Sequence, residues 1–135
     1  MSQPRRTLIF LAEDNPADVY LIREALYQSG LNYELDVAED GERASAHIER
    51  YSHEQAPDLI VLDLNLPRLN GSELLALVRR TDTLRGIPVV IFTSSDSPYD
   101  RDQAARLGAT LYLRKPSNLD EFMKVGEQLK DLMEE

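Results

Sequence analysis

Acidic, hydroxyl and basic side chains stand within two residues of the ends of four short apolar runs of this chain. Glu13-Asp14 follows the first run and Asp63 follows a later one, while Thr93 and Lys115 follow two others. In open parallel α/β sheets, ligands bind outside the carboxyl ends of the strands. If each run is a strand of such a sheet, we expect the fold to bring these residues together despite their wide separation in sequence.

Together, these side chains suit phosphoryl transfer. Three carboxylates at one edge of a sheet would repel one another unless a cation neutralised them. Mg²⁺ prefers oxygen ligands and is commonly held by one or two carboxylates plus a phosphate. The Lys115 ammonium offers a positive charge to a phosphate oxygen, and the Thr93 hydroxyl offers a donor. A carboxylate can also act as the nucleophile and form an aspartyl phosphate.

Each of these residues also has an ordinary structural explanation. A carboxylate after a strand often caps the following helix, which alone would account for Asp14 or Asp63. Thr93 alone would be a turn residue, and Lys115 alone would be a solvated charge. Their joint occurrence, each at the end of a different run, favours a site over coincidence.

Five alternating strands and helices are needed to position these residues. We expect strands at 8–12, 34–38, 59–62, 89–92 and 111–113. We expect helices from Asn15-Pro16 to Gly30, at 41–53 with Asp40 as cap, from Asn70-Gly71 through Val78, at 99–107, and a last one with Phe122, Val125, Leu129 and Leu132 on one face. Continuous apolar strands between helices indicate an α/β fold with a parallel sheet covered on both faces.

Composition restricts the class of protein further. The 135 residues, 42% of them hydrophobic, fit one domain, and we expect residues 1–135 to form it with no output domain attached. The net charge of −9 argues against binding nucleic acid or anionic membrane surfaces. Cysteine is absent, which excludes disulfides and thiolate sites. With no signal sequence and no apolar run of about 18 residues, we expect a soluble, cytoplasmic protein.

The motifs resemble those of the receiver domains of two-component response regulators. They stand in the family's order and span essentially the whole chain. The resemblance implies a flavodoxin-like (βα)5 fold with a doubly wound sheet in strand order 2-1-3-4-5. The matching segments are Leu11-Ala12-Glu13-Asp14-Asn15, Leu62-Asp63-Leu64-Asn65-Leu66-Pro67 with Asn70-Gly71, Phe92-Thr93-Ser94 and Leu113-Arg114-Lys115-Pro116.

The resemblance implies a role for each acidic residue. Asp63 is the expected phosphoacceptor, and Asp14 is an expected Mg²⁺ ligand. Glu13 would hold the water shell of the metal, and the backbone carbonyl of Asn65 would complete the metal site. The protein would then be a phosphoacceptor that assists its own phosphotransfer and dephosphorylation, rather than an enzyme acting on a separate substrate.

The resemblance also implies phosphoryl-binding and switch residues. Thr93 and Lys115 would hold the phosphoryl oxygens. Tyr112 occupies the position of the family's switch aromatic, whereas without the family match it is as well explained as an amphipathic strand tyrosine. Asn65 and Ser94 vary within the family and line the route of the hydrolytic water, which leaves the phosphate lifetime open.

The turn after the last strand carries one further expectation. Receivers use a cis Lys-Pro bond there to aim the lysine inward, and cis bonds are accessible chiefly before proline. We therefore predict a cis bond between Lys115 and Pro116.

More narrowly, three features resemble small regulators paired with bacterial phytochrome kinases. They are residues 13–18, residues 63–67 and the long connection 81–86. The implied partner is a sensor histidine kinase of this light-sensing type. A homodimer through the face of the fourth helix, fifth strand and fifth helix is a further expectation, because an unpaired edge strand invites partner contact.

Other functions are open to test. An aspartate-nucleophile phosphatase usually has a second acidic residue two positions after the nucleophile, where this chain has Asn65. A degenerate receiver that only binds partners would lack acyl-phosphate formation with Mg²⁺. A nucleotide-binding domain is disfavoured, because the chain has neither a glycine-rich dinucleotide turn nor a P-loop.

Overall fold

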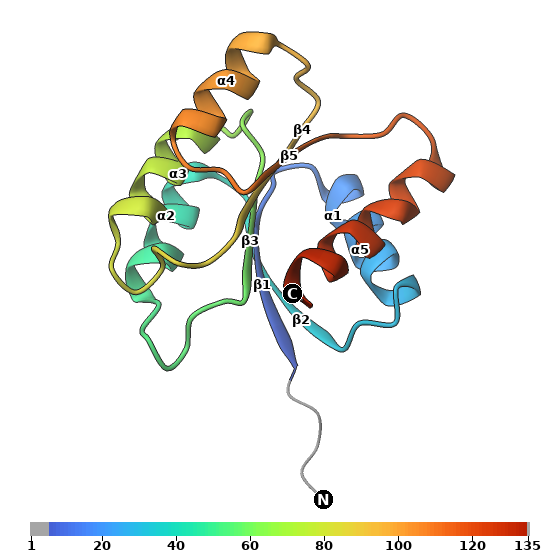
Figure 1. Cartoon of the computed structure of the whole chain (residues 1–135), viewed down its shortest axis with the longest axis horizontal. Coiled ribbons are helices and arrows are strands. Elements are labelled where there is room, and N and C mark those ends of the chain that lie inside the picture. The colour runs from blue at the N-terminus through green and yellow to red at the C-terminus, as the bar shows by residue number, and fades with distance from the viewer. Residues whose placement is uncertain (1–5, 135) are drawn as a thin grey trace, which may run out of the picture.

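The computed structural model describes residues 6–134 and contains one parallel five-stranded sheet between two layers of helices (Figure 1). The strand order β2-β1-β3-β4-β5 confirms the predicted fold class and topology. The strands are β1 (Thr7–Ala12), β2 (Tyr33–Ala38), β3 (Leu59–Leu62), β4 (Val89–Thr93) and β5 (Leu111–Arg114). The helices are α1 (Pro16–Gln28), α2 (Gly41–Arg50), α3 (Gly71–Arg80), α4 (Pro98–Arg106) and α5 (Leu119–Met133).

Alternation along the strands divides the core into two clusters, one on each face of the sheet. In β1, Phe10 and Ala12 belong to the cluster under α2, α3 and α4, whereas Ile9 and Leu11 belong to the cluster under α1 and α5. β3 and β4 are buried along their whole length because both of their faces are covered. The two layers hold the strand ends, and therefore the loops that follow them, in fixed relative positions.

The helices begin where side chains can cap them. The side chains of Asn15, Asp40 and Asn70 each accept a hydrogen bond from a backbone N–H in the first turn, which confirms the predicted caps Asn15 and Asp40 and the predicted helix start at Asn70-Gly71. Ser97 and Asn118 cap α4 and α5 in the same way. These caps fix where the chain turns from each strand end into its helix.

The main difference from the expected boundaries lies at the end of α2. This helix ends at Arg50 rather than at residue 53, and Tyr51 follows with an extended backbone. The Tyr51 hydroxyl donates a hydrogen bond to Asp36 of β2, so a contact with the sheet draws the chain out of the helix. Within residues 6–134, no helix is both long and apolar enough to cross a membrane.

Candidate functional site

The loops after β1 and β3 bring three carboxylates together. Glu13, Asp14 and Asp63 each place one carboxylate oxygen within 4.8 Å of the others. Glu13 and Asp63 are buried, being 1% and 4% exposed, whereas Asp14 is exposed. One side of the cluster is therefore open to solvent, as a site for an exchangeable cation must be.

The surroundings of Glu13 fit a divalent cation. Burial raises the pKa of Glu13 to about 7, and Lys115 offsets only part of this effect. Glu13 Oε1 is buried without a hydrogen-bond partner, although it lies 2.7 Å from Lys115 Nζ as an ion pair. A buried carboxylate with one oxygen left without a hydrogen bond is suited to an oxygen-preferring cation. Glu13, Asp14 and Asp63 are thus the side chains able to hold the metal.

Asp63 is held through both of its oxygens. Its Oδ1 accepts a hydrogen bond from the backbone N–H of Asn65 at 3.0 Å, and its Oδ2 accepts one from Lys115 Nζ at 2.8 Å. The backbone of Asn65 therefore lies beside the carboxylate cluster. Its carbonyl as a metal ligand stays a prediction.

Lys115 is the central cation of the site. Its Nζ lies 2.8 Å from Asp18 Oδ2 and 2.7 to 2.8 Å from Glu13 and Asp63. Burial lowers the pKa of this ammonium, but its interactions with the carboxylates of Asp18, Asp63 and Glu13 more than offset burial and leave the pKa above its ordinary value. Lys115 is therefore charged across the physiological pH range.

Asp18 is the site residue that sequence reasoning missed. The sequence assigned it only to the first turn of α1, where a carboxylate favours the positive end of the helix. Asp18 is the third residue after the cap Asn15, and a side chain there leans back toward the helix start. α1 begins just after the end of β1, where Glu13 and Asp14 stand. A carboxylate in the first turn of a helix that starts beside the site is the signal that would have identified Asp18.

Thr93 and Tyr112 lie on neighbouring strands at the same edge. Thr93 is fully buried, and its Oγ1 accepts a 3.4 Å hydrogen bond from the Asn65 side-chain amide. The Tyr112 hydroxyl donates to the backbone oxygen of Ser95 at 3.0 Å, and the guanidinium of Arg101 lies 4.5 Å from the ring centroid. Tyr112 is thus attached to the connection that follows Thr93.

The prediction of a cis bond between Lys115 and Pro116 was wrong, because residues 6–134 contain no cis peptide bond. The backbone N–H of Lys115 donates to the Thr93 carbonyl at 2.8 Å, which extends the pairing of β5 with β4. The Lys115 side chain reaches Asp63 from this position with a trans bond, the isomer that is preferred by about 0.5–1 kcal/mol before proline. A cis bond is not needed to direct the lysine inward.

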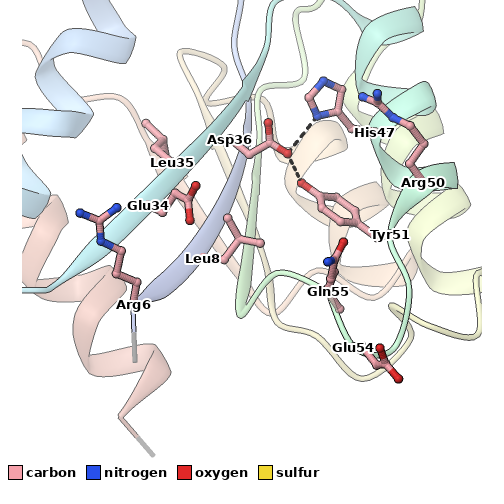
Figure 2. A pocket seen from close by; sticks show the side chains of 11 residues that line it. Arg6, Leu8, Glu34, Leu35, Asp36, His47, Arg50, Tyr51, Glu54 and Gln55 are labelled. Carbon is pink, nitrogen blue, oxygen red and sulfur yellow. Dashed lines mark hydrogen bonds and ion pairs between the residues drawn. The ribbon is translucent and has the colours of Figure 1, made fainter. Parts of the chain in front are cut away.

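A hollow of about 670 Å³ lies away from this site (Figure 2). It is lined by residues of β1, β2 and α2 and by the chain after α2, whereas the carboxylate cluster follows the carboxyl ends of the strands. In this hollow, the Asp36 carboxylate accepts a hydrogen bond from the Tyr51 hydroxyl and lies 3.0 Å from His47 Nδ1. The His47 ring stacks on the ring of Phe10. These groups satisfy one another and fasten α2 to the sheet, so we assign them a structural role.

Comparisons with known proteins agree with this geometry. The profile of the response regulator receiver domain matches residues 9–126, a range that contains every residue of the site. Response regulator Rcp1 of Synechocystis sp. is 37% identical over 121 residues, which cover 87% of this chain and 82% of Rcp1. The phosphorylated cyanobacterial phytochrome response regulator RcpA has a TM-score of 0.87 at 36% identity, covering 96% of this chain and 94% of RcpA. The Mn²⁺-bound form of Rcp1 has a TM-score of 0.83 at 35% identity, covering 93% and 92% of the two chains.

Proposed function

The chain belongs to the response regulator receiver domain family, and from that premise we propose that Asp63 is the residue that accepts the phosphoryl group. The observation that carries this proposal is the placement of Asp63 directly after β3, the middle strand, in contact with Lys115 and beside the acidic pair. No other carboxylate of the site combines burial with hydrogen bonds that orient both of its oxygens. A fixed nucleophile loses little entropy in reaching the reactive geometry.

The group transfer is written as a displacement at phosphorus. A carboxylate oxygen of Asp63 forms a bond to phosphorus while the bond from phosphorus to the donor's leaving atom breaks. With a phosphohistidine donor, the leaving imidazole nitrogen keeps the electron pair and takes up a proton. The Lys115 ammonium and the Thr93 hydroxyl hold phosphoryl oxygens. Glu13, Asp14, Asp63 and the Asn65 carbonyl would hold Mg²⁺, which would supply positive charge to balance that of the phosphoryl group.

A sensor histidine kinase is the proposed donor. RcpA is named as a phytochrome response regulator, and its likeness to this chain supports a phytochrome-type kinase as the specific partner. We further propose that residues 1–135 act as a single receiver domain in the cytoplasm. Its output then passes through a change in protein contacts, without nucleic acid or membrane as a direct partner.

Phosphorylation with a small-molecule donor tests the role of Asp63. Incubation with acetyl phosphate and Mg²⁺ should attach one alkali-labile phosphate, and chelation of the metal should prevent it. Asp63→Asn should abolish labelling. Asp40→Asn is the matched control, because asparagine also caps a helix and Asp40 lies outside the site.

The same experiment separates the alternatives. Equal labelling of Asp63→Asn and wild type would refute the assignment of the acceptor. A wild-type protein that takes up no phosphate would favour a degenerate receiver that acts as a protein-interaction module. Steady turnover of a generic phosphate ester would instead indicate an aspartate-nucleophile phosphatase.

A further inference from the structure

One ammonium group at this site is shared among three carboxylates from three segments. Lys115 Nζ contacts Glu13, Asp18 and Asp63 at 2.7 to 2.8 Å. Two of the three N–H donors of the ammonium group are hydrogen-bonded to Asp18 and Asp63, and the contact with Glu13 is an ion pair. The side chains of Lys115 and Asp18 are 10% and 18% exposed, which leaves their charges poorly screened by solvent.

Asp18 differs from the other two partners of Lys115. Glu13 and Asp63 belong to the carboxylate cluster that can hold a cation, together with Asp14, whereas Asp18 does not. A bound divalent cation would therefore take over the charge of Glu13 and Asp63 and leave Asp18 as the remaining carboxylate on Lys115. The positive charge that a phosphoryl group needs from Lys115 is then already balanced by Asp18.

Charge balance gives the direction of the effect. With all of them ionised, Glu13, Asp14, Asp18 and Asp63 oppose one ammonium, so a divalent cation still leaves one negative charge in excess. Replacing Asp18 by a neutral residue removes that excess. The change should weaken attraction for a cation and strengthen attraction for a phosphoryl group, because the two ligands have opposite charges.

We propose that Asp18 is a positioning residue that holds the Lys115 ammonium in the site and, through its negative charge, strengthens metal binding while weakening the hold on a phosphoryl group. This inference rests on the proposed function, since it requires phosphorylation at Asp63. Asp18, in the first turn of α1, would then influence the fraction of the protein that is phosphorylated at a given concentration of phosphodonor. The ordinary role of Asp18 near a helix start gives no reason for opposite effects on the two ligands.

Two titrations of the intact chain test the proposal. The first measures the affinity for Mg²⁺ alone, and the second measures the affinity for beryllofluoride, a phosphoryl analogue, at saturating Mg²⁺. In both, binding is followed by the NMR chemical shifts of the backbone amides. Asp18→Asn should bind Mg²⁺ about three- to tenfold more weakly and beryllofluoride about three- to tenfold more tightly, as expected for one partly screened charge a few ångströms away. Asp18→Ser should show the same two changes, and it serves as a second neutral variant in case Asp18→Asn folds poorly. Asp18→Glu keeps the negative charge and should retain the wild-type affinities.

Asp120→Asn is the matched control, because Asp120 is an exposed carboxylate in the first turn of α5. It should change neither affinity. Unchanged or weaker beryllofluoride binding by both neutral Asp18 variants would overturn the inference, and loss of both affinities would assign Asp18 a purely structural role. A wild-type protein that is not labelled at Asp63 would instead overturn the proposed function, so the two failures are distinguishable.

Discussion

Glu13 links proton binding, metal binding and stability at the scale of one side chain. Burial raises its pKa in the folded protein from 4.5 to about 7. A carboxyl group whose pKa is raised on folding binds its proton more tightly in the folded state, so protonation stabilises the fold. This contribution to the free energy of unfolding is fully present below pH 4.5 and is lost as pH rises toward 7. A cation binds the ionised form and competes with the proton.

We therefore predict that stabilisation by Mg²⁺ grows with pH. One proton must leave Glu13 for each cation bound, so the apparent Mg²⁺ affinity should fall by up to about tenfold per pH unit below pH 7. The rise in Tm caused by Mg²⁺ should accordingly be larger at about pH 8 than at about pH 5.5, since a ligand stabilises by mass action. Thermal melts with and without Mg²⁺ at both pH values measure this difference.

Glu13→Gln supplies the control for this prediction. Glutamine keeps the shape of the side chain but has no proton to release, so the remaining Mg²⁺ response should lose most of its dependence on pH. The same Mg²⁺ shift at both pH values in wild type would show that Glu13 is ionised throughout.

Two residues show where sequence reasoning reached its limit at the site. The types and order of Glu13, Asp14, Asp63 and Lys115 predicted a common location, and the structure brings them together because they follow strands of one sheet. The contact of Asp18 with Lys115 depends on how the first turn of α1 lies over the sheet edge, which no local pattern specifies. The peptide bond after Lys115 was predicted to be cis and is trans, and the Lys-Pro pair by itself does not distinguish the two isomers.

At the scale of elements, the first residue of α3, Gly71, lies in close contact with the backbone of Asp63, the proposed phosphoacceptor. A Cβ atom built on Gly71 would lie 2.3 Å from the carbonyl oxygen of Asp63 and 2.8 Å from the Cα of Leu64. Backbone atoms cannot move aside as the end of a flexible side chain can. The glycine therefore permits α3 to begin directly against the loop that holds Asp63.

We predict that Gly71→Ala destabilises the fold by about 1–3 kcal/mol, as overpacking in a close-packed region does. It should also slow phosphorylation, because relief of the clash displaces Asp63. Gly86→Ala is the matched control, since a Cβ there meets nothing within 4 Å. Urea unfolding and acetyl phosphate labelling of both variants test this, and equal stability of the two would contradict it.

Element boundaries were predictable where the signal was local. Apolar runs identified β1, β3 and β4 because these strands are covered on both faces, and polar residues at the helix starts identified the beginnings of α1, α2 and α3. The end of α2 was placed too late because the contact between Tyr51 and Asp36 joins segments distant in sequence. Propensity alone carries no information about such a contact.

For the whole molecule, α4 differs from the other helices that flank the site in how little of it is buried. α5 buries Phe122, Val125, Gly126 and Leu129, whereas α4 buries only Ala104. A helix with so small a buried face costs little to displace. α4 also begins close to Ser95, which accepts the hydrogen bond from Tyr112. The site and the surface formed by α4, β5 and α5 are thus joined through β4 and β5.

We predict that phosphorylation changes this α4-β5-α5 surface through Thr93 and Tyr112. A phosphoryl oxygen near the Thr93 hydroxyl would be a stronger acceptor for its proton than the site offers before phosphorylation. Movement of Thr93 would shift the following connection, to which the Tyr112 hydroxyl is bonded at 3.0 Å. Since Arg101 of α4 stacks on the same ring, the displacement would be passed to the helix. A coupling free energy of about 1–3 kcal/mol would change partner affinity by about 5- to 150-fold.

Dimerisation through this surface is the readout we expect. Sedimentation of the wild type at several protein concentrations, with and without beryllofluoride and Mg²⁺, should show tighter self-association in the activated form. Tyr112→Ala should still be labelled at Asp63 but should lose this difference, because the link from β5 to α4 is cut. Tyr27→Phe changes an exposed tyrosine on α1, outside the α4-β5-α5 surface, and should behave as wild type. If Tyr112→Ala responds to beryllofluoride as the wild type does, the signal reaches the surface by another route, and Tyr112 is a structural residue of β5.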